Sequence, residues 1–230
     1  MYVLGIDTST RVCSLAIVEK EEVIGELAVK PVLPHAPFLV PAVEQLLKWV
    51  GISVSCLGGI GVALGPGSFT GLKIGLATVK GLALVTGLPV AGVVTLDALA
   101  RGGSWFKGLV CPLVPCRKNE VFAALYRSME NGLTRISDYS VLSLSELAGL
   151  GLEKNQSVLF LGEGAAIYRA NLYSFFGRRA VFVDDVVGSR CGTWVALLAE
   201  QRFRQGCQDD ISALQPLYLK PPPITVKKGG

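Results

Sequence analysis

The stretch ALGPGSFTGLKIG, residues 63–75, joins two apolar runs through four glycines and one proline. Its Gly65-Pro66-Gly67 segment predicts a tight turn at the end of a strand over residues 59–64. Ser68 or Thr70 is placed to cap a helix over residues 68–86, because a hydroxyl oxygen can accept the free N–H groups of a first helical turn. A strand, a glycine turn and a helix in this order predict one βα unit of an α/β fold.

Three catalytic or nucleotide-binding motifs resemble this stretch but fail on spacing. A Walker A loop needs GxxxxGK[ST], whereas Lys73 stands two residues beyond Gly71 and is not followed by Ser or Thr. A dinucleotide fingerprint needs GxGxxG, and GPGSFTG is one residue longer. A nucleophile elbow needs GxSxG, but the residue directly before Ser68 is already glycine. Two interpretations stay open: an anion at the helix N-terminus, or close helix packing along Gly71, Gly75 and Thr78.

The first hundred residues predict three antiparallel strands followed by alternating strands and helices. The three strands are short, rich in Val, Ile and Leu, and too closely spaced for βαβ crossovers. Around the glycine turn, apolar residues recur at helical spacing before and after it. The predicted elements are strands over 2–6, 12–18 and 23–29, a helix over 38–50, the strand over 59–64, the helix over 68–86, a strand over 88–94 and a helix over 95–101.

The same order recurs in the second half. We predict strands over 109–114, 121–127 and 133–142, a helix over 144–150, a strand over 158–161, a helix over 165–176, a strand over 180–183 and a helix over 191–204. The expected fold is α/β, with two related domains over 1–106 and 107–218, each a mixed sheet of three antiparallel strands and then βα units, flanked by helices. Residues 219–230 contain three consecutive prolines and predict a flexible tail.

Composition favours a cytoplasmic protein with one large core. Of 230 residues, 50% are hydrophobic and 17% are charged, and the net charge of +4 permits nucleic-acid contact without arguing for it. The N-terminus lacks the pattern of a signal peptide. The most apolar segment, 70–89, contains Lys73 and Lys80, each of which would cost about 2.5–3.5 kcal/mol at a bilayer centre. Six scattered cysteines without a CxxC pair predict reduced thiols.

Few polar residues of this chain are candidates for catalysis or for binding a metal or phosphate. His35 is the only histidine, which excludes zinc motifs with paired histidines and leaves His35 as the only partner for a Ser–His or Cys–His pair. Asp7, Thr8, Ser9 and Thr10 follow the first strand. Such a loop binds Mg²⁺ and the phosphates of ATP or ADP in some proteins, and in others only satisfies its own turn amides. Both interpretations stay open.

Four segments together resemble one family. GIDTST (5–10), PHAPFLVPAVEQLL (34–47), GPGSFTGLKIGLATVKGLAL (65–84) and LQPLYLKPP (214–222) follow in the order typical of the bacterial TsaB (YeaZ) family, in the glycoprotease-like superfamily. These proteins are needed to make threonylcarbamoyladenosine beside the anticodon of certain tRNAs. The resemblance implies an actin-like, sugar-kinase-like (ASKHA) fold of two related domains, in agreement with the doubled order of elements.

The resemblance implies a partner role without catalysis. The transferring relative, TsaD, binds its metal through two histidines in an HxxxH motif, whereas His35 is followed by Ala36 and has no second histidine. Family members commonly carry Asp-Ala-Arg where this chain has Pro115-Cys116-Arg117, so a metal–phosphate site in the second half lacks its acid. We therefore expect neither a catalytic residue nor a metal ligand in this chain.

The family also implies partners and a contact surface. The expected partners are TsaD and the ATPase subunit TsaE, with a homodimer as the alternative, tRNA reached only through the complex, and no membrane. The contact is expected on the helices over 38–50 and 70–86, at Leu39, Val43, Gly71, Lys73, Ile74, Gly75 and Thr78. Two other functions are weighed: an active ASKHA kinase or ATPase using Asp7 and Mg²⁺, and a peptidase, suggested only by the superfamily name.

Overall fold

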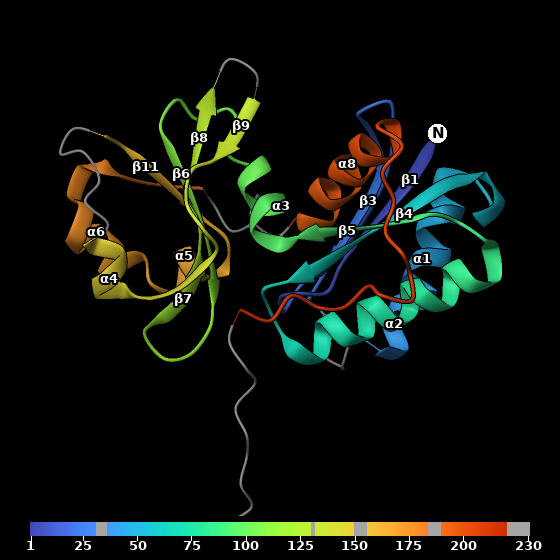
Figure 1. Cartoon of the computed structure of the whole chain (residues 1–230), viewed down its shortest axis with the longest axis horizontal. Coiled ribbons are helices and arrows are strands. Elements are labelled where there is room, and N and C mark those ends of the chain that lie inside the picture. Colours follow the sequence, from blue (N-terminus) through green and yellow to red (C-terminus); the bar gives the residue numbers. More distant parts are fainter. Residues whose placement is uncertain (31–35, 130–131, 150–155, 184–189, 220–230) are drawn as a thin grey trace, which may run out of the picture.

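The first of two β-sheets lies in the N-terminal half of the computed structural model, which describes residues 1–30, 36–129, 132–149, 156–183 and 190–219 (Figure 1). Its strand order is β3-β2-β1-β4-β5. The strands β1, β2 and β3 pair antiparallel, while β4 and β5 continue the sheet parallel to β1. Their bounds are β1 Tyr2–Asp7, β2 Cys13–Glu19, β3 Glu22–Val29, β4 Leu57–Gly65 and β5 Val90–Val94.

The second sheet repeats this order around β6. Antiparallel β7 and β8 pair with β6 on one side, and parallel β11 and then β12 follow on the other. The outer antiparallel position is taken by β9 and β10. The predicted doubled topology is thereby confirmed. The bounds are β6 Leu109–Pro115, β7 Glu120–Ala123, β8 Tyr126–Met129, β9 Gly132–Arg135, β10 Ser140–Ser143, β11 Val158–Leu161 and β12 Ala180–Phe182.

Two predicted strands of the second half are each interrupted. β6 pairs with β7 and β8 in one continuous register, and Pro112 faces the interruption at Ala124. Proline has no N–H to donate, so the ladder weakens there. The strand expected over 133–142 breaks near Ser137, whose Oγ accepts the N–H of Leu125 at 2.8 Å. A side-chain oxygen thus replaces a backbone partner, which period-two patterning does not reveal.

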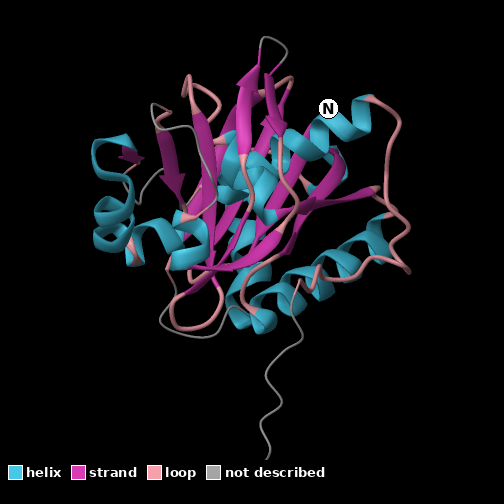
Figure 2. Cartoon of the chain, turned by 60° about the vertical axis from the view of Figure 1, so that its left-hand side comes forward, coloured by secondary structure: helices cyan, strands magenta, loops and turns pink. Residues whose placement is uncertain are grey.

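The helices form three layers with the sheets between them (Figure 2). α1 (Ala36–Val50) and α2 (Phe69–Thr86) cover the outer face of the first sheet. α3 (Thr95–Arg101) and α8 (Cys191–Arg204) lie between the two sheets. The outer face of the second sheet is covered by α4 (Leu144–Ala148), α5 (Glu163–Ile167) and α6 (Arg169–Phe176). The single helix expected over 165–176 is therefore two, interrupted at Tyr168, and short 3-10 turns occupy Val54–Cys56 and Gly177–Arg179.

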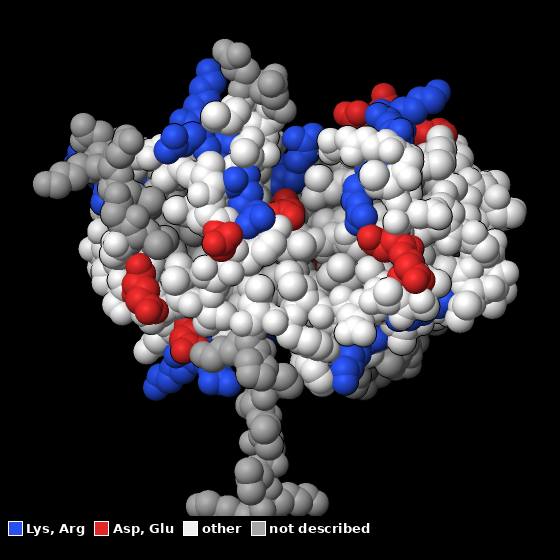
Figure 3. Space-filling view, in the orientation of Figure 1, with Lys and Arg blue, Asp and Glu red and all other residues white. Residues whose placement is uncertain are grey.

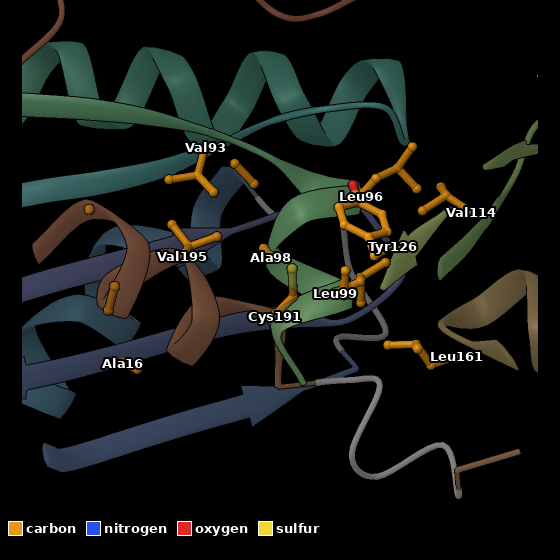
Figure 4. Close-up of a cluster of buried hydrophobic side chains, with 14 of the residues drawn as sticks. Ala16, Val93, Leu96, Ala98, Leu99, Val114, Tyr126, Leu161, Cys191 and Val195 are labelled. Carbon is orange, nitrogen blue, oxygen red and sulfur yellow. The ribbon is translucent and has the colours of Figure 1, made fainter. Parts of the chain in front are cut away.

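The central layer is thin and shared by both halves. Figure 4 shows Val93 of β5 beside Val195 of α8, and Leu96 of α3 beside Tyr126 of β8. Helix α8 approaches the first sheet closely because two strand positions carry no side chain. A Cβ at Gly5 would overlap the backbone of α8, and a Cβ at Gly61 would overlap Ala199. Burial of this shared cluster joins the two halves into one hydrophobic core.

The end of the chain returns to the first sheet, although the sequence assigned 107–218 to the second domain. α8 packs on β1, β2 and β4. Beyond it, the N–H of Asp209 donates to the carbonyl of Val90 at 2.8 Å, and the N–H of Leu217 to the carbonyl of Leu64 at 2.7 Å. We propose that residues 190–219 belong with the first domain. Residues 220–230 of the predicted tail, like His35, lie outside the described residues.

Helix α2 is long and apolar enough, by length and composition, to pass a simple test for a membrane span. Within the fold, its apolar residues have a different explanation. Leu72, Leu76, Val79 and Ala83 are buried against the first sheet, together with two glycines of the same helix. This packing accounts for the apolar residues on the inner face of α2.

A buried carboxylate connects α8 to the β2–β3 hairpin. Glu200 is 2% exposed and accepts the N–H groups of Lys20 at 2.7 Å and of Glu21 at 2.9 Å. Both hairpin residues have positive φ, 52° and 67°, so their N–H groups are free to point toward α8. Arg204 adds a hydrogen bond to Glu200 at 3.0 Å.

We predict that Glu200→Gln lowers the free energy of unfolding by about 1.5–3 kcal/mol, because hydrogen bonds to a charged acceptor are lost from a buried site. Urea unfolding monitored by circular dichroism measures the change. Glu22→Gln, at an exposed position of the same hairpin, serves as the control and should change stability by less than about 0.5 kcal/mol. Equal stability of the two variants would contradict a structural role for Glu200.

Candidate functional site

The loop between β1 and β2 directs its polar side chains inward. Asp7, Thr8 and Ser9 are each 1% exposed, and Thr10 is half-buried. Thr8 donates its Oγ1–H to the carbonyl of Gly71 in α2 at 2.7 Å, and Asp7 accepts the N–H of Ser9 at 2.8 Å. Most of the hydrogen-bonding capacity of this loop is therefore used within the chain.

Two buried thiols lie close to Asp7. The Cys191 thiol, at the start of α8, hydrogen-bonds to the Asp7 carboxylate. Burial foremost, and then the charge of Asp7, raise the pKa of Cys191 well above its usual value and that of Cys13 to about 12. Both thiols therefore stay protonated near neutral pH, and Cys191 remains a donor to Asp7. These contacts support a structural role for Asp7.

Two glycines of α2, Gly71 and Gly75, pack against this loop. Ser68 caps the helix, its Oγ accepting the N–H of Gly71 at 3.2 Å. A Cβ at Gly71 would overlap the carbonyl oxygen of Thr8, and one at Gly75 would overlap the Thr8 hydroxyl. Both glycines are buried. The expectation that they face a partner helix is therefore wrong, because spacing reveals a small-residue stripe but not the neighbour that it meets.

The other predicted contact residues divide between core and surface. Leu39 and Val43 are 0% and 4% exposed, inside the core beneath α1, so they are not surface contacts. Lys73 is exposed, and its Nζ lies 4.1 Å from the centroid of the Phe69 ring. Ile74 and Thr78 are half-buried and border the outer face of α2.

Sequence reasoning missed the residues that form this outer face. On α2, Leu84 is 77% and Val85 is 89% exposed, and Gly81 has open space where a Cβ would stand. On α1, Val40 is 43% and Trp49 is 65% exposed. Helical periodicity identifies both faces of such a helix equally well. The sequence signal for this surface was the presence of large apolar residues outside the stripe that faces the core.

A cleft of about 520 Å³ opens between the β1–β2 loop, the start of α2, the end of β6, α5 and residues 217–219. Ser9 and Thr10 line it, whereas Asp7 and Thr8 do not. The Ser9 Oγ is buried and has no hydrogen-bond partner among the described residues. Arg11 crosses the cleft toward α5, with its Nε 3.3 Å from the Glu163 carboxylate.

The rest of the lining limits the chemistry of this cleft. Pro115, Cys116 and Arg117 line it where the family commonly has an acid, and many remaining contacts are apolar. A Mg²⁺–nucleotide held through Asp7 does not fit, because that carboxylate does not line the cleft. Within the ranges described above, no three His, Cys, Asp or Glu side chains gather as metal ligands.

Two similar mixed sheets facing each other across clefts define an ASKHA protein. Solved structures of this class superpose on most of this chain. The ROK hexokinase from Thermus thermophilus gives a TM-score of 0.50 at 12% identity, covering 90% of this chain and 100% of the hexokinase. The (R)-2-hydroxyglutaryl-CoA dehydratase component A from Acidaminococcus fermentans gives 0.55 at 12% identity, covering 88% and 98%. These likenesses establish the fold.

Closer relatives identify the family. The family model described as "TsaD: tRNA N6-adenosine threonylcarbamoyltransferase" matches residues 31–225. The Bacillus subtilis tRNA threonylcarbamoyladenosine biosynthesis protein TsaB is 30% identical over 222 residues, covering 96% of this chain and 94% of the relative. YeaZ from Pseudomonas aeruginosa gives a TM-score of 0.78 at 25% identity, covering 95% and 99%. The chain therefore belongs to the TsaB (YeaZ) family of tRNA threonylcarbamoyladenosine biosynthesis proteins.

We predict opposite effects of alanine at two glycines of α2. Gly71→Ala should lower the free energy of unfolding by about 1–3 kcal/mol, because the new methyl group meets backbone that cannot move aside. Gly81→Ala, the matched control, should raise it by up to about 1 kcal/mol through helix propensity. Chemical denaturation of both variants measures the difference. If neither variant were less stable than the parent, α2 would not pack closely on Thr8.

We also predict that Asp7→Ala lowers the free energy of unfolding by about 1–3 kcal/mol, because the Ser9 N–H and the Cys191 thiol lose their acceptor. Asp138→Ala, at a fully exposed carboxylate, is the control. Calorimetric titration of the parent with ATP and Mg²⁺ tests the other interpretation. Tight Mg²⁺-dependent binding that Asp7→Ala abolishes without loss of stability would show that the loop is a nucleotide site.

Proposed function

We propose that this chain acts as the non-catalytic partner of TsaD when a threonylcarbamoyl group is transferred to tRNA. Membership of the TsaB family supports involvement in a TsaD-containing complex. The structural observation that carries the proposal is the pair α1 and α2. These helices contact each other and present Val40, Trp49, Leu84 and Val85 to solvent.

The chemistry of this helix pair suits a protein partner. Exposed apolar side chains on adjacent helices mark association surfaces more often than chance, since their burial on binding is favourable. Small residues at the centre of the α2 outer face, Ala77 and Gly81, allow another helix to approach closely. Because the TsaD family model matches 31–225 of this chain, we infer that TsaD offers an equivalent helix pair and that the four helices pack together.

The remaining roles follow from this arrangement. TsaE and tRNA would join through the assembled complex in the cytoplasm, and a second copy of this chain is the alternative occupant of the α1–α2 surface. The kinase or ATPase alternative relies on Asp7, whose hydrogen bonds lie within the fold. The peptidase alternative has no support from the described cleft residues. A partner role therefore accounts best for the observations.

The function is tested by reconstitution with TsaD, TsaE, threonine, bicarbonate, ATP and unmodified tRNA, followed by nucleoside analysis. This chain alone should form no threonylcarbamoyladenosine, and omitting it from the full mixture should reduce product strongly. Modified adenosine made by the isolated chain would show that it is itself the transferase. Undiminished product without it would show that it has no part in the reaction.

The contact surface is tested with Gly81→Leu. Its side chain enters open space in the free protein, so unfolding should occur at the same or higher temperature, whereas a packed interface would be forced apart. We expect about 5- to 100-fold weaker association with TsaD, measured by calorimetry and size-exclusion chromatography. Gly81→Ala should bind within about threefold of the parent. Unchanged association of Gly81→Leu would place the contact elsewhere.

A further inference from the structure

A second cleft, of about 670 Å³, lies on a different part of the boundary between the halves. β5 and α3 form its base, the C-terminal part of α8 one wall and the β8–β9 hairpin the other. Figure 3 shows basic and acidic side chains gathered in this upper region, where α3 lies in Figure 1. Its lining shares no residue with the first cleft.

An unusual division of hydrogen bonds leaves one arginine unpaired at this cleft. Asp97 and Arg101 stand four residues apart on α3, a spacing that commonly gives an ion pair. Asp97 instead accepts the hydroxyl of Tyr126 at 2.6 Å and that of Tyr139 at 2.7 Å. Arg101 lines the cleft and is half-buried, and its guanidinium makes neither a hydrogen bond nor an ion pair with any residue in the described part of the chain.

The tyrosines keep Asp97 occupied. Burial foremost, and the neighbouring Asp97, raise the pKa of both Tyr126 and Tyr139. Their hydroxyls therefore stay protonated and continue to donate to the carboxylate across the physiological pH range. Both Asp97 oxygens are thus engaged by tyrosines, and the structure shows no ion pair between Asp97 and Arg101.

The other arginines of the cleft differ in availability. Arg202 has its charge paired by a bidentate contact with Asp209, both bonds 2.8 Å, and it donates a further bond to the Gly92 carbonyl at 2.7 Å. Arg135 lies over the ring of Tyr139, 4.1 Å from its centroid, and uses Nη1 for the Ser137 carbonyl at 2.9 Å. The same Nη1 also lies 4.0 Å from the exposed Asp138 carboxylate. The Nε and Nη2 groups of Arg135 make no hydrogen bond to the described residues, so they and the Arg101 guanidinium form the available positive pair.

We propose that this cleft binds a phosphate group through the guanidinium groups of Arg101 and Arg135. A half-buried charge without a partner is unfavourable, and a bound anion removes that cost. The planar fork of arginine matches the oxygens of phosphate. The cleft volume lies within the range of small-ligand sites and admits one nucleotide. The choice of phosphate over carboxylate rests on the proposed function, because ATP and tRNA both carry phosphate.

The test begins with calorimetric titration of the full chain with pyrophosphate and with ADP. Arg101→Met keeps the apolar part of the side chain and removes its donors. Arg127→Met is the control, since Arg127 is exposed and follows Tyr126, so its side chain projects from the opposite face of β8. We expect salt-dependent binding to the parent, roughly 10- to 100-fold weaker binding to Arg101→Met, and a change below about twofold for Arg127→Met.

A second arm identifies the source of the phosphate. The assembled complex with TsaD is titrated with unmodified tRNA at several salt concentrations. Weaker tRNA binding by Arg101→Met, with a salt slope reduced by about one, would assign the cleft to the RNA backbone. Unchanged tRNA binding with weakened pyrophosphate and ADP binding would assign it to a free nucleotide. Arg101→Lys, which keeps the charge but loses the fork, should fall between parent and Arg101→Met if the latter unfolds.

Two results would overturn the phosphate site. One is a parent that binds neither pyrophosphate nor ADP while all variants bind tRNA equally. The other is equal weakening by Arg101→Met and Arg127→Met, which would indicate general surface charge. Reconstituted tRNA modification is scored separately. Product formation without phosphate binding removes only this proposal, whereas phosphate binding without any effect of the chain on product removes only the proposed function.

Discussion

Helix α8 lies directly on the first sheet because Gly5 and Gly61 leave room for its backbone and for Ala199. This close packing keeps the central layer thin enough for α3, which packs against α8, to contact both sheets at once. The two halves therefore share one apolar cluster, and clefts remain at their boundary where that cluster ends. The position of α8 also affects the β2–β3 hairpin at the surface, because Glu200 of α8 accepts hydrogen bonds from that hairpin.

The two clefts differ in the hydrogen-bond partners of their polar side chains. In the first, Asp7 and Thr8 are turned inward and hydrogen-bonded within the fold. The loop thus stabilises the packing of α2, and the carboxylate that lines this cleft, Glu163, is paired with Arg11. In the second, Asp97 accepts hydrogen bonds from two tyrosines, and the Arg101 guanidinium has no partner among the residues that the structure describes. The outer faces of α1 and α2 instead expose large apolar side chains, Val40, Trp49, Leu84 and Val85, and we propose that this surface associates with protein.

Much of the fold was predictable from local pattern. Apolar alternation and helical spacing located nearly every strand and helix, and their repeated order indicated two related sheets. The departures have local causes that pattern does not contain. Pro112 of β6 interrupts the pairing with β7 and β8, although the sequence of those two strands contains no proline or glycine at the break. At the second break, the Ser137 hydroxyl oxygen takes the place of a backbone carbonyl as acceptor for Leu125. The break at Tyr168 likewise lies within a continuous apolar pattern.

By itself, the sequence determined the α/β class, the doubled topology and the family, because these depend on periodicity and on motifs that are continuous in the chain. It also revealed a stripe of small residues on α2. Only the tertiary structure decided which side of that helix is free. Gly71 and Gly75 meet Thr8, more than sixty residues away in the chain, while Gly81 faces open space. It likewise decided that α8 belongs with the first sheet and that Arg101 lacks its expected partner, because side-chain pairing depends on which distant groups compete for each donor and acceptor.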